Sequence, residues 1–306
     1  MIITGHDDED SIIVVVGKIT QLVEKGEKVE IYYNEALDPT LLLDAVVEVC
    51  EYLQYNTKDI TIHFKDLIYK DDRFTVLNDV PSYNISVFSS AIDYISYNGE
   101  YDYGLFLSKP SSVRMEAFYK SESLSLKGLT SFNYPENRLN ISSITEFIED
   151  HPTTWENYWK RIPYSDIDSL TNDILMPGKN SLGWEDIYEK IPMEVVCETN
   201  LIPNSLAITE KTLRPMYYHR IPLFIGPLNY CKNLKALGFD IFEDVIDVSY
   251  DDLEYQMRVD RVFEIVKDLH RKYDIHSLLE RLKPRLQHNH DIVVDLAKNH
   301  YERLSQ

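Results

Sequence analysis

A group of polar residues at 208–215 has the composition of a phosphate-binding turn. The stretch reads Ile-Thr-Glu-Lys-Thr-Leu-Arg-Pro, and an apolar run follows it at 221–226. If a helix begins near Thr209, its first N–H groups lack intrahelical partners and attract phosphate oxygens. Lys211 would add a point charge, and Arg214 would add a planar fork that binds a diphosphate bidentately.

Glu210 lies among these residues and suits a different part of a ligand. A carboxylate cannot bind phosphate, but it accepts two hydroxyl hydrogen bonds and therefore fits a ribose diol. The same string also fits a capped surface helix that carries an exposed Glu-Lys pair. The string alone does not decide between these two interpretations.

The wider segment 195–252 resembles part of a known enzyme family. It contains Glu-Thr-Asn-Leu from Glu198, the stretch 208–215, the run 221–226, and Leu-Gly-Phe-Asp-Ile-Phe-Glu-Asp-Val-Ile-Asp-Val-Ser-Tyr-Asp-Asp from Leu237. These residues resemble the carboxyl-terminal, donor-binding half of fucosyltransferase-like glycosyltransferases. The resemblance is strongest to the glycosyltransferase-like proteins of tailed bacteriophages.

A second part of the resemblance lies upstream, in the order that the family has. Gly-Leu-Phe-Leu-Ser-Lys-Pro at 104–110, Arg-Met-Glu-Ala-Phe-Tyr at 114–119 and Lys-Gly-Leu-Thr-Ser-Phe at 127–132 resemble the family's strand, basic loop, helix and serine-containing strand. The phage proteins carry two basic residues in this loop, roughly as Arg-x-x-Arg. This chain has Lys109 and Arg114 with a longer gap. Arg114 corresponds to one of these two basic residues, and the sequence does not decide which residue corresponds to the other.

The resemblance implies a glycosyltransferase with two Rossmann-like domains that face each other across a cleft, the GT-B architecture. The second domain would bind a nucleotide-diphosphate sugar, with a UDP-sugar favoured, and the first would present the acceptor. The predicted donor-binding residues are Thr209, Glu210, Lys211, Arg214, Glu198 and Arg114. No Asp-x-Asp motif follows a predicted strand as a metal site, so we expect metal-independent transfer without a further cofactor. Lys211 and Arg214 would then neutralise the leaving diphosphate.

An acidic loop near the amino terminus is the predicted source of a general base. His6, Asp7 and Asp8 follow a predicted strand at 1–4, and a base there would deprotonate the acceptor hydroxyl in an inverting reaction. A retaining reaction does not require this base, and a solvated acidic turn explains the same residues. We do not expect residues 7–10 to bind a metal, because four adjacent acids on an extended loop cannot all point into one coordination shell.

The net charge and its distribution along the chain limit which acceptors the protein can bind. The net charge of −20 argues against general attraction to a nucleic-acid backbone, but residues 256–306 carry ten Lys and Arg against eight Asp and Glu. This tail fits either a solvated amphipathic helix or a basic face for a polyanion, with Lys283 and Arg285 as the positions to test. The phage-like resemblance makes 5-hydroxymethylcytosine in phage DNA the first acceptor to consider, with glucose or arabinose as the sugar. The alternatives are a small-molecule or surface-glycan acceptor, and a catalytically silent binding protein with the donor fold.

Cysteine usage and hydropathy indicate the compartment. Cys50, Cys197 and Cys231 are far apart and odd in number, which favours reduced packing residues. The acidic amino terminus does not resemble a signal peptide, and no apolar run approaches the roughly 20 residues of a membrane span. We expect a soluble protein of the cytoplasm, that of the host cell if the chain is phage-encoded.

Alternating strands and helices predict an α/β fold with mostly parallel sheets. Strands are predicted at 1–4, 29–33, 59–64, 85–88, 103–107, 195–197 and 223–225, with one more leading into 243–244. Helices are predicted at 41–55, 113–121, 210–219 and 230–237, and from 251 to the end with an interruption at Pro284, while 11–25 fits either a strand or a helix.

Length and composition suggest the domain boundaries. The 306 residues suit two domains, an acceptor-side Rossmann-like domain at 1–150 and a donor-binding domain with a helical tail at 191–306. Residues 151–190 would join them, because the chain around them is rich in Pro and aromatic residues. Trp155 and Trp159 lie there at helical spacing, which favours packing over stacking on a base or sugar.

Overall fold

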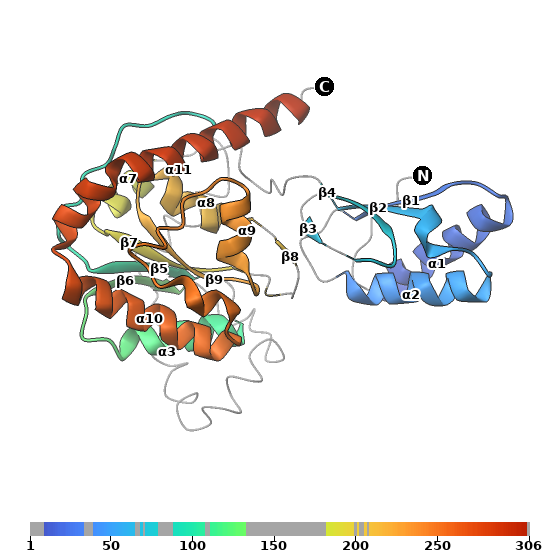
Figure 1. Ribbon diagram of the computed structural model, residues 1–306, viewed down its shortest axis with the longest axis horizontal. Helices are drawn as coiled ribbons and strands as arrows, with labels where there is room; N and C mark the ends of the chain where they lie inside the picture. The colour runs from blue at the N-terminus through green and yellow to red at the C-terminus, as the bar shows by residue number, and fades with distance from the viewer. Residues whose placement is uncertain are drawn as a thin grey trace. The chain divides into compact units, whose positions relative to one another are not determined.

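The chain divides into two compact units in a computed structural model, which describes residues 9–33, 39–64, 68–69, 71–78, 88–107, 111–132, 182–198, 201, 205–206 and 208–304. Unit 1 comprises Met1–Tyr83 and Asn200–Thr209, and unit 2 comprises Asn84–Thr199 and Glu210–Gln306. Both contain parallel strands and helices, so the predicted α/β class is confirmed (Figure 1).

Unit 1 is built on a three-stranded parallel sheet in the order β1-β2-β4. Its elements are α1 (Glu9–Glu24), β1 (Val29–Tyr33), α2 (Thr40–Tyr52), the short helix η1 (Thr57–Asp59), β2 (Ile60–Phe64) and β4 (Thr75–Asn78). A separate antiparallel pair joins β3 (Ile68–Tyr69) to β8 (Ser205–Leu206). The strand predicted at 1–4 lies outside the described residues.

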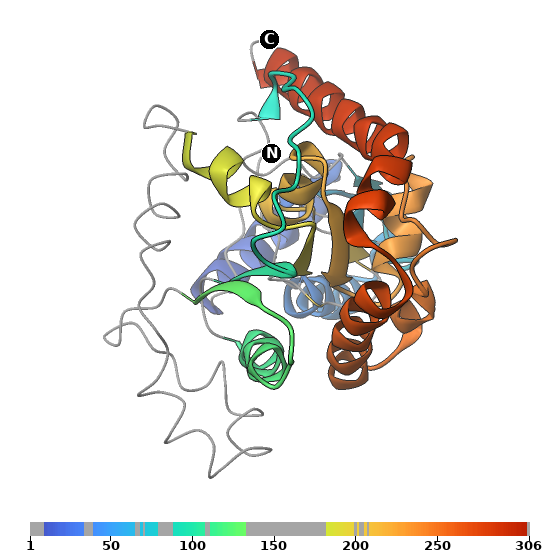
Figure 2. The same cartoon turned by 90° about the vertical axis from the view of Figure 1, so that its left-hand side faces the viewer.

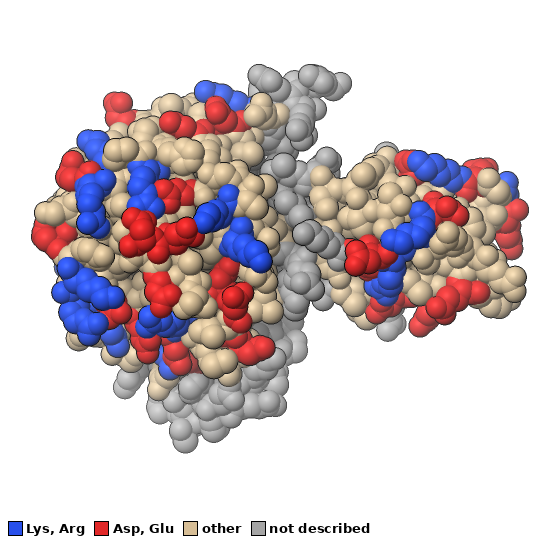
Figure 3. Space-filling model, in the orientation of Figure 1, with Lys and Arg blue, Asp and Glu red and all other residues tan. Residues whose placement is uncertain are grey.

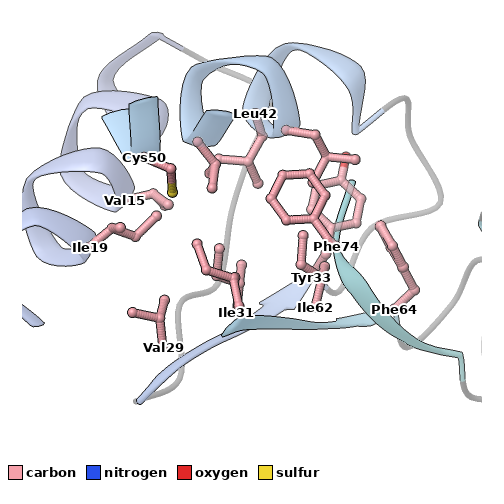
Figure 4. Packing of buried hydrophobic residues seen from close by; sticks show 13 residues of the cluster. Val15, Ile19, Val29, Ile31, Tyr33, Leu42, Cys50, Ile62, Phe64 and Phe74 are labelled. Atoms are coloured by element: carbon pink, nitrogen blue, oxygen red, sulfur yellow. The ribbon is translucent and has the colours of Figure 1, made fainter. Parts of the chain in front are cut away.

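The core of unit 1 lies between the sheet and its two helices. Alternate residues of β1 are buried, among them Ile31, while Val15 and Ile19 stand four residues apart on one face of α1 (Figure 4). Because this four-residue spacing lets α1 bury one apolar stripe, the ambiguous segment 11–25 forms a helix. Leu43 and Val46 from α2 belong to the same cluster, as do Ile62 and Phe64 from β2.

Unit 2 is built on a four-stranded, wholly parallel sheet in the order β6-β5-β7-β9. Its strands are β5 (Tyr103–Leu107), β6 (Gly128–Phe132), β7 (Met193–Cys197) and β9 (Ile221–Ile225). Its helices are α3 (Ser112–Glu122), α7 (Leu182–Glu189), α8 (Glu210–Tyr217), α9 (Tyr230–Ala236), η5 (Val248–Asp252), α10 (Tyr255–Lys272) and α11 (Ile275–Leu304).

Every residue of β5, β7 and β9 is buried, as expected for a parallel sheet that helices cover on both faces. Helices α3 and α10 pack together on one face, and α8 and α11 pack together on the other (Figure 1). None of the helices in the described ranges combines the length and apolar character needed to cross a lipid bilayer.

The units divide the chain differently from the predicted boundary at residue 150. Strands β5 and β6, placed by sequence in the first domain, lie in one sheet with β7 and β9, because Gly104 and Leu105 pair with Glu194 and Val195. Most of the predicted interdomain region 151–190, with Trp155 and Trp159, lies outside the described residues. Its last part is α7, which buries Trp184 and Tyr188 in unit 2.

Two element predictions are wrong in detail, and a third, the strand at 85–88, lies outside the described residues except for Phe88. No strand leads into Glu243, because the backbone of Asp240 bonds instead to the side chain of Asn289, with both N–H and C=O engaged at 2.8 Å. Pro284 lies inside α11, and the break between the long helices comes at Tyr273, where the backbone is extended. Phe88, the described end of the strand predicted at 85–88, is not in a strand.

Candidate functional site

The winding of the unit 2 sheet changes direction between β5 and β7. The chain passes from β5 through α3 to β6 on one side, and later returns to β7 on the other side of β5. In open α/β sheets, ligands bind beyond the carboxyl ends of the strands at such a switch point. The residues that follow β5 and β7 therefore form the candidate site.

Several of the predicted donor-binding residues meet at this edge. Arg114 lies in the first turn of α3, which Ser111 caps by accepting the Arg114 N–H at 3.4 Å. Glu198 directly follows β7 and extends its pairing by donating its N–H to Ile225 at 3.0 Å. Burial lowers the pKa of the Arg114 guanidinium, while Glu198 and Glu210 act in the opposite direction, so these carboxylates lie within electrostatic reach of it.

Glu198 is also the centre of a buried hydrogen-bond network. Its side chain is 2% exposed, and its Oε1 accepts from Thr212 Oγ1 at 2.6 Å and from Tyr230 OH at 3.2 Å. The two hydroxyl oxygens are themselves 2.7 Å apart. The network ties β7 to α8 and α9, which fixes the position of the carboxylate. The sequence interpretation missed both Thr212 and Tyr230.

Gly226 leaves the space that this network needs. A Cβ atom at residue 226 would lie 2.7 Å from Cγ of Tyr230, closer than real Cβ contacts allow. The tight turn after β9 thus lets the Tyr230 ring pass close to the backbone and reach Glu198.

Glu210 and Lys211 begin α8, as the sequence predicts, directly after Thr209. Lys211 Nζ lies 2.5 Å from Glu210 Oε1, and the two side chains are 16% and 22% exposed. Burial acts to raise the pKa of Glu210, but the Lys211 ammonium outweighs it and the pKa lies below its ordinary value. The Glu-Lys pair exists, and it is mostly buried rather than exposed.

Arg214 lies elsewhere, in a buried ion pair. Its Nη2 is 2.6 Å from Glu194 Oε1, its Nε donates to Tyr188 OH at 2.9 Å, and its guanidinium lies 4.1 Å from the centre of the Trp184 ring. Burial acts to lower its pKa, but Glu194 outweighs that effect, so Arg214 stays charged. A carboxylate inside the apolar strand Met193–Cys197 was the sequence signal for this pair.

The helix after β9 has its amino-terminal groups already satisfied. The carboxylate of Asp251, from η5, accepts the N–H of Cys231 at 3.0 Å and that of Lys232 at 3.1 Å. Because an internal anion occupies these donors, the start of α9 does not offer a phosphate site. The start of α8 is the remaining candidate among the helices that follow β7 and β9.

The remaining site predictions are tested little or not at all. His6, Asp7 and Asp8 lie outside the described residues. In the described part of the chain, no group of three or more His, Cys, Asp or Glu side chains could hold a metal ion. Cys50, Cys197 and Cys231 are buried and unpaired, and burial raises the pKa of Cys197 to about 12, which makes the thiol unreactive.

The cations proposed for a basic face are engaged within unit 2. Arg285 binds Asp240 at 2.5 Å and Asp244 at 2.8 Å, and the Lys283 ammonium lies 4.4 Å from the centre of the Tyr94 ring. Figure 3 shows Lys and Arg interspersed with Asp and Glu over the visible face of this unit. The tail therefore offers less free positive charge than its composition suggests.

Comparison with known proteins adds no family. No protein-family model matches the chain, and no curated protein matches its sequence.

Proposed function

We propose that this protein is a glycosyltransferase that uses a nucleotide-diphosphate sugar, with unit 2 as its donor-binding unit. The observation that carries the proposal is the convergence of Arg114, Glu198 and Glu210 at the switch point of a parallel sheet, with Lys211 beside them. Ligand sites in such sheets lie at this edge, and the family resemblance at 104–132 and 195–252 covers the same residues.

Each residue has a definite role in this proposal. The first turn of α8 and Lys211 hold the diphosphate, and Glu210 accepts hydrogen bonds from the ribose hydroxyls. As the acceptor oxygen bonds to the anomeric carbon, the bond to the diphosphate oxygen breaks and negative charge develops there. The acceptor hydroxyl gives up its proton, in an inverting reaction to the general base proposed among His6, Asp7 and Asp8 and in a retaining one to the departing diphosphate. Lys211 and Arg114 stabilise that charge, and Glu198 balances the buried Arg114.

The acceptor that we propose to test first is 5-hydroxymethylcytosine in DNA, with glucose or arabinose as the sugar. Because Arg285 is neutralised by two carboxylates, DNA would have to bind through other cations. If DNA is the acceptor, its KM must rise with salt while that of a free nucleoside does not. Salt-independent transfer to a small molecule or a glycan would favour the alternative acceptors.

A catalytically silent binding protein is the second candidate, and the internal use of charge favours it. Arg214 is committed to Glu194, and the start of α9 is filled by Asp251. In a donor-binding fold that no longer catalyses transfer, we expect side chains of the protein to occupy groups that would otherwise bind the ligand. Binding of a nucleotide without turnover on any acceptor would identify this case.

The decisive experiment is a thermal-shift panel of nucleotide diphosphates and nucleotide sugars, with and without EDTA. We expect one nucleotide family to stabilise the wild-type protein, Lys211→Ala to abolish the shift, and EDTA to leave it unchanged. Lys232→Ala is the matched control, because Lys232 is exposed on α9 outside the candidate site. The absence of any shift in the wild type would overturn the proposal.

A further inference from the structure

A buried histidine pair holds the segment that leads into the sheet of unit 2. Residues 88–97, which we call the strap, contain no α-helix or strand and lie beside α11 (Figures 1 and 2). The Tyr217 hydroxyl donates to the carbonyl of Ser90 at 2.7 Å, and the Ile92 N–H donates to His290 Nε2 at 3.4 Å. These bonds attach the strap to α8 and α11.

The hydrogen bonds of His290 require a neutral ring. Its Nδ1 lies 2.6 Å from the carbonyl oxygen of Tyr217, which can only accept, and its Nε2 faces the amide of Ile92, which can only donate. The single ring proton is therefore on Nδ1. A second proton on Nε2 would set two N–H groups against each other and break the bond to the strap.

His219 is stacked on His290 in surroundings that disfavour its protonation. The ring centres are 4.4 Å apart with an interplanar angle of 16°, and His219 is fully buried at a left-handed φ of 58°. Its Nε2 is 3.2 Å from Gln287 Oε1, whereas its Nδ1 is buried without a hydrogen-bond partner among the described residues. Burial, reinforced by His290, lowers the pKa of His219 to about 4.

Arg220 makes an added charge still less favourable. The side chain is fully buried and, among the described residues, donates only to main-chain carbonyls, one of which is that of Ile95 in the strap at 2.8 Å. No carboxylate in the described part of the chain accepts a hydrogen bond from it. Among the described residues, the other titratable or charged groups that face this cluster are Asp291, Lys283 and Glu280 from α11, Tyr94 and Tyr97 from the strap, Tyr217 from α8, and Tyr188 and Glu189 from α7.

We propose that the His219–His290 pair is a proton-sensitive latch, whose protonation releases the strap from α8 and α11 while the parallel sheet stays paired. The strap yields first because isolated hydrogen bonds and ring contacts hold it, such as Phe88 on Tyr217 at 4.9 Å. The strands, in contrast, are held by continuous ladders. A positive charge inside the cluster meets Arg220 and a stacked imidazole, so the charge is relieved only when the strap opens to water.

Hydrogen exchange measured by mass spectrometry tests the latch. Protection factors, corrected for the intrinsic effect of pH, are compared at about pH 7 and about pH 4 for strap peptides and for peptides of β7 and β9. We expect the strap to lose about tenfold more protection than the strands, the change that one pKa unit of coupling gives. Retained strap protection in the wild type at the lower pH would overturn the proposal.

Two variants separate the histidines from other groups that titrate in this range. His219→Asn with His290→Asn cannot gain charge, and Asn tolerates the left-handed backbone at 219. This double variant must keep the strap protected at the lower pH, whereas His288→Asn, on an exposed part of α11, must behave as the wild type does. If the double variant lost as much strap protection as the wild type, a carboxylate such as Asp291 would be responsible and the latch would be refuted.

A measurement on the wild-type chain alone decides the matter if the double variant does not fold. Imidazole proton signals in NMR give the pH at which the His219 and His290 rings titrate. The strap must open with the same midpoint as one of these rings. Opening at a different pH would show that protonation of the pair is not the cause.

Discussion

At the scale of single residues, the role of each buried arginine depends on the groups that compensate its positive charge. Arg114, Arg214 and Arg220 are all buried in unit 2, yet their surroundings differ. Arg214 has the carboxylate of Glu194, Arg114 lies near Glu198 and Glu210, and Arg220 has only carbonyl groups among the described residues. Arg214 therefore has a structural role, Arg114 belongs to the candidate site, and Arg220 belongs to the latch.

The Arg214–Glu194 pair gives a prediction about stability. Arg214→Met alone leaves the Glu194 carboxylate buried without its cation, so the free energy of unfolding should fall by about 3–5 kcal/mol. Adding Glu194→Leu removes that unpaired charge and should restore most of the loss. Urea denaturation of both variants measures this, with Arg271→Ala as a control near zero, because Arg271 is 74% exposed. Equal losses in the single and double variants would contradict the prediction.

At the scale of elements, side chains of one helix replace pairing that strands would otherwise provide. Asn289 of α11 bonds the backbone of Asp240 as a neighbouring strand would, and Arg285 ties the same residue through its carboxylate. This explains why the chain after α9 forms turns instead of the predicted strand. Helix α11 continues past Pro284 for a different reason. Leu282 and Leu286, on either side of the proline, are both buried, and their packing holds the helix in place.

Two glycines provide a test of how elements pack, with opposite expected signs. Gly226→Ala places a Cβ against the Tyr230 ring and should destabilise the protein by about 1–3 kcal/mol. Gly17→Ala lies in the exposed interior of α1 with nothing within 4 Å of the added Cβ, and should stabilise unit 1 by roughly 1 kcal/mol. Denaturant midpoints of the two variants decide the prediction, and effects of equal sign would refute it.

At the scale of the whole molecule, the chain forms two units whose sequences interleave. Residues 200–209 belong to unit 1, although in the sequence they stand between the two segments of unit 2. Their strand β8 pairs with β3, which also belongs to unit 1. Each unit has its own buried core and its own parallel sheet. Separate cores permit separate unfolding, so acid that acts on one unit need not act on the other.

The pH dependence of unit 2 follows from His219. Burial lowers the pKa of this residue from 6.5 to about 4, so between these values the unfolded chain binds a proton that the folded chain does not. The free energy of unfolding of unit 2 therefore falls as pH falls through this window, by up to about 3 kcal/mol, and is unaffected by this group above it. His219→Asn should flatten that part of the curve.

Calorimetry at a series of pH values measures this effect. The transition of unit 2 should lose stability in the wild type relative to His219→Asn, and the transition of unit 1 should not differ between them. His276→Asn, at an exposed position of α11, is the control. Identical pH curves for the wild type and His219→Asn would contradict the assignment to this histidine.

The sequence by itself determined the local elements and much of the residue set at the switch point. Strands 29–33 and 103–107 and the helix that starts at Glu210 follow from apolar spacing and capping, which act over a few residues. Arg114, Glu198 and Glu210 were chosen from the resemblance of their segments to the glycosyltransferase family. Arg114 and Glu198 follow β5 and β7, which are neighbours in one parallel sheet and end at the same edge. The glycosyltransferase activity that we infer from them stays a prediction.

Only the tertiary structure decided which strands share a sheet and which cation meets which anion. Pairing of Gly104 with Glu194 depends on contacts between residues far apart in sequence, so the boundary at 150 could not be read from local composition. Arg214 and Lys211 are three residues apart on one helix, yet one pairs with the strand carboxylate of Glu194 and the other with its neighbour Glu210. Burial fixes such choices, because a charge removed from water takes the partner that the fold places beside it.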